Sequence, residues 1–113
     1  MSKRVEQVND HLRTIIGNII LKELELPPGV FATITKVKTA PDLRTDQVFL
    51  SIIPDDKSVS TFKYLNKRLG LIQHLLGKEI TFRYIPKIFL KLDYTERQAF
   101  HIEGILDKLE EKD

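Results

Sequence analysis

Histidine is the residue type best suited to metal binding and acid–base chemistry, and the chain has three: His11, His74 and His101. They lie far apart on three predicted helices, and none has a Cys, His or Asp neighbour at the spacing of known metal sites. The chain has no cysteine, which excludes a disulfide framework, a thiolate zinc site and a cysteine nucleophile. We therefore expect no metal centre and no cofactor.

Paired carboxylates are the next candidates for catalysis. Asp55 and Asp56 directly precede a predicted helix, where carboxylates cap free N–H groups and meet the positive end of the helix dipole. Glu110 and Glu111 lie in a charged, solvated end of the chain, so neither pair resembles a buried acid–base dyad. There is no Gly-rich phosphate loop and no Gly-x-Ser-x-Gly elbow. We expect a protein that is not an enzyme.

Basic residues are the third group, and the net charge of +2 conceals how unevenly they are placed. Residues 57–91 contain eight Lys and Arg against one Glu, whereas residues 92–113 contain three basic and seven acidic residues. Lys63 and Lys67 lie one helical turn apart, and Arg83, Lys87 and Lys91 recur at four-residue steps in a β-like segment. Such rows can neutralise RNA phosphates and release counterions. A solvated surface explains the same composition, and composition alone favours neither explanation.

The elements that must position these residues follow from hydrophobic periodicity, with a period near 3.6 for helices and 2 for strands. The predicted elements are a helix from Lys3 to Glu25, a strand from Val30 to Thr39, a turn from Ala40 to Asp46, a strand from Gln47 to Ile53, a helix from Val59 to Leu76, a strand from Glu79 to Asp93, and a helix from Thr95 to Glu111.

Several residues add detail to the faces, ends and edges of these predicted elements. The strand over 30–39 has a mixed pattern, with Ile34 and Lys36 on one predicted face and Val37 on the other. Gly77 is the expected C-cap of the long helix. Pro86 indicates an edge position or a bulge in the last strand, because proline cannot donate to a ladder.

Gly70 interrupts the long helix and is a plausible place for a kink or for a junction of two shorter helices. A glycine there permits either close packing of neighbouring elements or close approach of an RNA backbone to helix N-terminal amides. The residue by itself favours the packing explanation.

The length of 113 residues, with 42% hydrophobic and 30% charged content, fits one soluble globular domain over residues 1–113. We expect a compact core over about residues 4–93 and an acidic helix or tail over about 95–113. No apolar run approaches the roughly 18 residues of a membrane helix, and the first residues lack the apolar run of a signal peptide. We expect a cytoplasmic monomer without a membrane partner.

The order of elements, α-β-β-α-junction-α-β, is that of a type II KH domain, an α+β fold in which helices cover one face of a three-stranded sheet and bind RNA. Three runs resemble the ribosome-binding factor A family: TITKVKTAPDLRTDQVFLSI, LNKRLGLIQHLLGKEITFRYIPKIFLKLD and FHIEGILDKL. They span most of the chain in the same order. The resemblance implies a factor that binds the small ribosomal subunit and its rRNA, assists late maturation including processing of the rRNA 5′ end, and matters most in the cold.

The chain departs from the family pattern at particular positions. Arg68-Leu69-Gly70 stands where the family has an Ala-x-Gly kink. Ala40 replaces a serine, and Gln73 replaces a frequent arginine, which removes one possible phosphate contact. Leu26-Pro27-Pro28-Gly29 replaces an acidic-Pro-Arg turn, and the chain ends in acidic residues where some members have a basic tail.

The expected mode of binding is docking on rRNA by shape and phosphate contacts, with little base recognition because Tyr64 and Tyr84 are expected to pack in the core. The candidate RNA-binding residues are Lys3, Arg4 and Arg13 of the first helix, Lys63, Lys67, Arg68, Gly70 and Lys78 of the kink region, and Arg83, Lys87 and Lys91 as a second tier, some of which can face the opposite side.

Two other kinds of protein fit the same residues. One is a free-standing KH-like binder of single-stranded RNA without a ribosomal role. The other is a protein–protein interaction domain that uses the acidic last helix, with the basic surface incidental.

Overall fold

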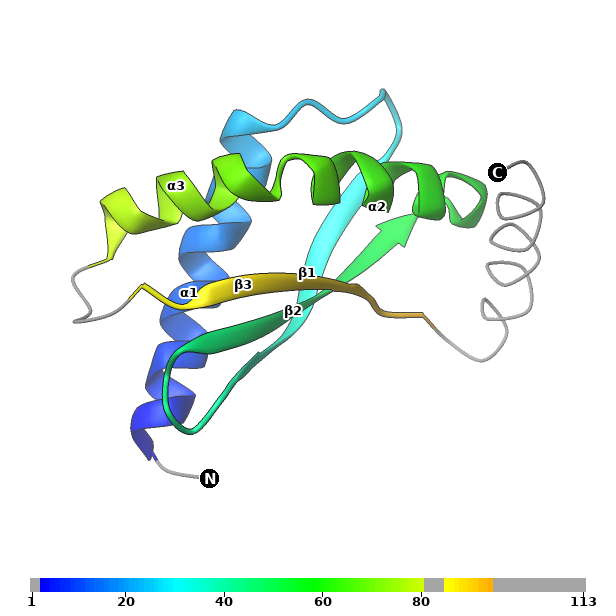
Figure 1. The fold of residues 1–113 in the computed structure, drawn as a ribbon. Coiled ribbons are helices and arrows are strands. Elements are labelled where there is room, and N and C mark those ends of the chain that lie inside the picture. Colours follow the sequence, from blue (N-terminus) through cyan, green and yellow to red (C-terminus); the bar gives the residue numbers. More distant parts are fainter. Residues whose placement is uncertain (1–2, 81–84, 95–113) are drawn as a thin grey trace, which may run out of the picture.

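The computed structural model describes residues 3–80 and 85–94 of the 113-residue chain. The elements are α1 (Lys3–Glu23), β1 (Phe31–Thr39), β2 (Thr45–Ile53), the short 3-10 helix η1 (Asp55–Lys57), α2 (Ser58–Lys67), α3 (Leu69–Glu79) and β3 (Lys87–Leu92). The predicted helix over residues 95–111 lies outside the described residues. Figure 1 shows α2 and α3 following each other end to end, with α1 running across their direction.

The three strands form one mixed sheet in the order β1-β2-β3. A hairpin makes β1 and β2 antiparallel, whereas β2 and β3 are parallel and are connected by α2 and α3. Parallel neighbours need a long crossover, and the two helices provide it. The fold is therefore α+β, with the expected order of elements.

One face of the sheet carries the core. Alternate β2 residues Val48, Leu50 and Ile52 are buried. Val48 and Leu50 are in register with apolar residues of both neighbouring strands, and Ile52 is in register with Ala32 of β1. The helices supply the other half of the core. Its fully buried large side chains include Leu12 and Ile16 of α1, Leu50 of β2, Leu65 of α2, Ile72 and Leu76 of α3, and Ile88 of β3. Each such side chain contributes roughly 1.5–3 kcal/mol to folding.

A β-bulge explains the mixed pattern of the first strand. Ile34 pairs with Leu50 and Lys36 pairs with Phe49, so that Thr35 is the extra residue. The side chains of β1 change parity at this point, because an inserted residue shifts the alternation by one. Val37 consequently faces the core, and Lys36 faces the opposite side of the sheet. The predicted faces of Lys36 and Val37 were wrong.

The boundaries after α2 also differ from the sequence prediction. The helix break is at Arg68, and Gly70 lies within the first turn of α3. Gly77 is not a C-cap, because α3 continues to Glu79 and Ile80 is the capping residue. The last strand begins only at Lys87, after the buried Pro86, and it is an edge strand as the proline indicated. Burial of Ile80 among core residues extends the helix past its glycine.

The carboxylates before α2 have the expected location. Asp55 and Asp56 form the first turn of η1, directly ahead of α2. The formal N-cap positions of η1 and α2 are Pro54 and Lys57, and neither supplies a side-chain capping bond. The acidic pair therefore lies near the positive end of the helix without occupying its cap position.

Asp46 is a fully buried carboxylic acid under α1. Thr39 Oγ1 contacts both Asp46 Oδ1 and Asn9 Oδ1, and the backbone N–H of Thr39 donates to Asn9 Oδ1 at 2.9 Å. Asp46 Oδ2 has no hydrogen-bond partner among the residues that the structure describes. A threonine hydroxyl has only one proton to donate, so it cannot donate to both oxygens at once, and we assign Asp46 as a buried carboxyl group that is incompletely paired.

The pKa of Asp46 agrees with this assignment. Burial raises the pKa of its carboxyl from 3.8 to about 6, against a smaller opposing effect of the Thr39 hydrogen bond. The folded state then holds a proton that the unfolded state has released. Stability is highest below the unfolded pKa and falls as the pH rises through the folded value.

We expect Asp46→Asn to remove this pH dependence, because the amide does not titrate, keeps the shape of the side chain and can still accept the hydrogen bond of Thr39. From pH 4.5 to pH 7.5, the free energy of unfolding of the wild type should fall by about 2 kcal/mol more than that of the variant. Urea unfolding at the two pH values measures this difference. The exposed acid Asp10 provides the control, and equal changes for Asp10→Asn and Asp46→Asn would contradict the assignment.

Candidate nucleic-acid interface

The junction of α2 and α3 is the centre of the predicted site. Arg68 leaves helical geometry, with φ −96° and ψ 9°, and its backbone N–H donates to Tyr64 O at 3.3 Å and Leu65 O at 3.0 Å. The next helix starts at once, since Ile72 N donates to Arg68 O at 3.0 Å. The two helices therefore remain close to one line, as Figure 1 shows, with a break of a single residue between them.

Gly70 has no packing role that the structure explains. A Cβ added at this residue would meet no atom within 4 Å, and the residue is exposed at the start of α3. The packing explanation therefore fails at this position. The bare backbone instead leaves room for a partner beside the positive end of the α3 dipole.

Basic side chains surround this glycine on the exposed side of the junction. Lys63 and Lys67 are exposed one turn apart on α2, and the guanidinium of Arg68 lies over the Tyr64 ring at 5.6 Å from its centroid. We call Lys63, Lys67, Arg68 and Gly70 the junction patch. No acidic residue occurs in the sequence between residue 57 and residue 78, so the carboxylate on these two helices is Glu79, at the far end of α3.

A groove lies beside the junction, between α2 and the edge strand β3. It has a volume of about 370 Å³ and an apolar floor that includes Phe62 and Leu90. Asn66 and Lys91 supply polar groups to its lining. The combination can hold an unstacked base, with an amide for its edge and an ammonium for its phosphate. Sequence reasoning missed Asn66, because no periodicity shows which polar residue faces a groove.

Gln73 fixes the position of α3 against β3. Its Nε2 donates to Pro86 O at 2.7 Å, and Ile88 N donates to its Oε1 at 2.9 Å. These backbone groups lie on the edge of β3 that faces away from β2, so the side chain partners an edge that would otherwise stay open. Gln73, which stands where the family has a frequent arginine, thus has a structural role.

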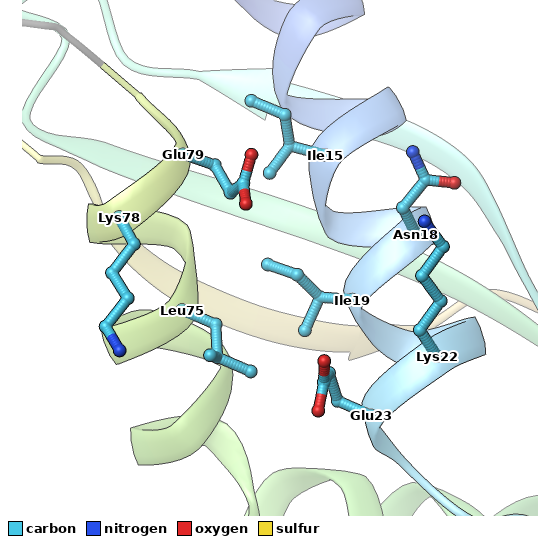
Figure 2. A pocket seen from close by; sticks show the side chains of 8 residues that line it. All are labelled: Ile15, Asn18, Ile19, Lys22, Glu23, Leu75, Lys78 and Glu79. Carbon is cyan, nitrogen blue, oxygen red and sulfur yellow. The ribbon is translucent and has the colours of Figure 1, made fainter.

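The remaining predicted residues do not join the junction patch. Lys78 is about 15 Å along α3 from Arg68. In the groove of about 180 Å³ between α1 and α3, Glu23 and Glu79 point inward, while Lys78 points away from α1 (Figure 2). Arg13 donates from Nη2 to Thr35 O at 3.3 Å, which ties α1 to β1.

Other predicted cations lie elsewhere or cannot be placed. Lys87 and Lys91 are exposed on the side of the sheet that the helices leave uncovered, although Lys91 also reaches the lining of the α2–β3 groove. The side chains of Lys3 and Arg4, and the whole of Arg83 and Tyr84, lie outside the described residues. Tyr64 packs against the core as expected.

Within the described residues there is no cluster of three His, Asp or Glu that can hold a metal ion. None of the helices that the structure describes combines the length and the apolar character needed to cross a membrane.

The arrangement α-β-β-α-α-β, with helices packed on one face of a three-stranded mixed sheet, defines the class as a type II KH-like α+β domain. Solved structures have the same fold. The Thermotoga maritima putative ribosome binding factor A gives a TM-score of 0.68 at 18% identity, covering 85% of this chain and 93% of that chain. The Thermus thermophilus ribosome-binding factor A gives 0.67 at 11% identity, covering 78% and 94%.

The chain belongs to the ribosome-binding factor A family, whose family model matches residues 4–106. A relative from Chlamydia felis is 33% identical over 115 residues, covering 99% of this chain and 96% of the relative. Another from Finegoldia magna is 29% identical over 113 residues, covering 97% and 93%. Both are named ribosome-binding factor A. The resemblance of the three sequence runs to this family is confirmed.

Gln73→Leu should destabilise the protein by about 1–3 kcal/mol, because Ile88 N–H and Pro86 O lose their partner in a partly buried position. Urea unfolding measures the loss, and amide hydrogen exchange at Ile88 should become faster. Gln73→Glu keeps the acceptor for Ile88, so its stability should lie between those of the wild type and Gln73→Leu. An unchanged urea midpoint in Gln73→Leu would show that solvent replaces both bonds.

Proposed function

We propose that this protein is a ribosome biogenesis factor without enzymatic activity, which binds the small ribosomal subunit and its rRNA and assists late maturation, including processing of the rRNA 5′ end. Membership of the ribosome-binding factor A family supports the ribosomal partner. A related Thermus thermophilus ribosome binding factor A has been fitted into a map of a 30S complex, and its coordinates share the fold at a TM-score of 0.62 and 14% identity, covering 74% of this chain and 88% of that chain.

The observation that carries the proposal to particular residues is the concentration of exposed basic side chains in the junction patch. Lys63 and Lys67 can each contact a phosphate, and Arg68 can add a third contact while its guanidinium stays close to Tyr64. Gly70 leaves the start of α3 accessible to the RNA backbone. Phosphate contacts of this kind fix position and orientation on a folded RNA rather than reading its sequence.

The mode of action follows from such contacts. A factor that recognises the shape of immature rRNA stabilises that conformation by its differential affinity, and it leaves when the mature fold no longer presents the site. We expect the protein to act as a monomer in the cytoplasm, as one domain over residues 1–113, and to matter most in the cold, where misfolded RNA rearranges slowly.

We expect the double variant Lys63→Glu/Lys67→Glu to lose salt-sensitive binding to immature small subunits. Losing two phosphate contacts should lower the slope of log K against log salt by roughly 1.4–1.8. Cosedimentation with immature small, mature small and large subunits across a salt series measures both affinity and preference.

The charge-matched control is Lys22→Glu/Lys57→Glu, which reverses two exposed lysines outside the junction patch. Binding without preference for small subunits would refute the ribosomal role. Equal losses in both double variants would refute the position of the contact. A protein–protein domain, by contrast, would bind its partner equally well after charge reversal at the junction.

Gly70→Ala separates the role of the bare backbone from that of the charge. The variant should be more stable by up to about 1 kcal/mol, because alanine is the better helix former and meets no neighbour. Its affinity for immature small subunits should fall about tenfold, a loss of about 1.4 kcal/mol in binding.

Gly17→Ala is the matched control for this substitution. Gly17 lies inside α1, where an added Cβ makes an ordinary contact with Ile34 Cδ1 at 3.8 Å. It should gain similar helix stability with unchanged subunit affinity, so that thermal unfolding and cosedimentation together distinguish the two glycines. Unchanged affinity in Gly70→Ala would show that the RNA backbone does not approach the start of α3.

A further inference from the structure

The helices that the structure describes cover one face of the sheet, and the opposite face presents lysines interleaved with phenylalanines. The register places Lys36, Phe49 and Lys91 in one row across the three strands. The next row contains Lys38, Gln47 and Phe89, and Lys87 follows opposite Thr45. We call Lys36, Lys38, Phe49, Lys87, Phe89 and Lys91 the sheet patch.

The charge of this face is strongly one-sided. The four lysines of the sheet patch are all exposed. The acidic residue that shares their parity is Asp93, directly after β3, and its Oδ2 accepts a hydrogen bond from Thr35 Oγ1 at 2.7 Å. Among the described strand residues of this face, no other carboxylate occurs. The face therefore attracts an anionic partner.

The two phenylalanines have no role in the core. Phe89 is 40% exposed, and Phe49 is half-buried on the face away from the helices. An ammonium lies near each ring: Lys36 Nζ is 5.6 Å from the Phe49 centroid, and Lys87 Nζ is 5.4 Å from the Phe89 centroid. These lysines are exposed and flexible, so a flat ligand can replace the ammonium above a ring while the ammonium moves to a neighbouring phosphate.

The geometry of the sheet relates the two rings. Phe49 is in register with Lys91, two residues beyond Phe89 on the adjacent strand. Strand spacing of about 4.8 Å and a rise of about 3.3 Å per residue place the two Cα atoms about 8 Å apart. Two successive unpaired bases of one strand can span this distance, each stacked on one ring.

We propose that the sheet patch is a second nucleic-acid surface, on which a single-stranded RNA segment stacks bases on Phe49 and Phe89 and places its phosphates against Lys36, Lys38, Lys87 and Lys91. Rings and cations in alternation fit unpaired RNA in particular. An acidic peptide uses only the lysines, and a duplex keeps its bases paired and unable to stack on side chains.

This surface is separate from the junction patch and does not depend on the ribosomal role. The junction patch lies on α2 and α3, whereas the sheet patch lies on the far side of the sheet from the helices. Lys91 of the sheet patch also lines the groove between α2 and β3, which lies beside the junction patch. An RNA strand that leaves the groove can therefore continue around the edge of β3 onto the sheet patch.

The test uses the full chain with fluorescein-labelled 12-nucleotide oligo(U) and oligo(A), measured by fluorescence anisotropy across a salt series. Phe89→Ala should weaken binding about 5- to 150-fold, the loss of one stacked base. Phe89→Tyr keeps a ring and should restore affinity. Phe31→Ala is the matched control, because Phe31 is 63% exposed at the N-terminal end of β1, outside the sheet patch.

The lysines are tested by charge reversal. Lys36→Glu/Lys87→Glu should reduce the salt dependence of RNA binding, and Lys22→Glu/Lys57→Glu should leave it unchanged.

Several outcomes would overturn the proposal. Equal effects of Phe89→Ala and Phe31→Ala, or equal binding of a 12-base-pair RNA duplex, would exclude specific stacking of bases on the sheet patch. Oligoglutamate of the same length binding as tightly as RNA would assign the face to an acidic protein. If oligonucleotide binding is lost in Lys63→Glu/Lys67→Glu but kept in every sheet-patch variant, the binding site for single-stranded RNA is the junction patch. Cosedimentation with subunits tests the ribosomal role separately. Circular dichroism and thermal unfolding verify the fold of each variant.

Discussion

The parallel pairing of β2 with β3 is the constraint on which the rest of the structure depends. Parallel strands cannot be joined by a tight turn, so the chain must cross the sheet between Ile53 and Lys87. The crossover here consists of α2 and α3, packed through Leu65, Ile72 and Leu76 onto the buried face of the sheet. Because these side chains face inward, the intervening lysines and the junction at Arg68 must face outward.

The same constraint creates an exposed strand edge, and the chain closes part of it with a side chain. Among the described strands β3 pairs only with β2, and Gln73 of α3 supplies a donor and an acceptor to backbone groups on its other edge. This clamp joins the helix of the junction to the strand that carries Lys87, Phe89 and Lys91. The groove lined by α2 and β3 and the basic junction are consequently held by one rigid framework.

Burial on a single face gives the sheet two different surfaces. The covered face contains aliphatic side chains and one isolated buried acid, Asp46, whose pKa is raised by its burial. The uncovered face combines Lys36 and Phe49, which are paired across β1 and β2. The bulge at Thr35 is needed for this division, because without it Lys36 would point into the core and Val37 into solvent.

For the described residues, the sequence by itself determined the order and type of the main helices and strands, since apolar side chains at helical or alternating spacing can be buried together in only one local conformation. It also determined that Lys63 and Lys67 share one helix side, and the three quoted runs identified the family. Tertiary structure decided the rest. Packing of Ile80 carried α3 past Gly77, the break came at Arg68, and pairing between strands revealed the bulge at Thr35. The separation of Arg13, Lys78 and Lys87 from the junction was likewise decided only by folding, because net charge along a chain contains no information on which surface each residue reaches.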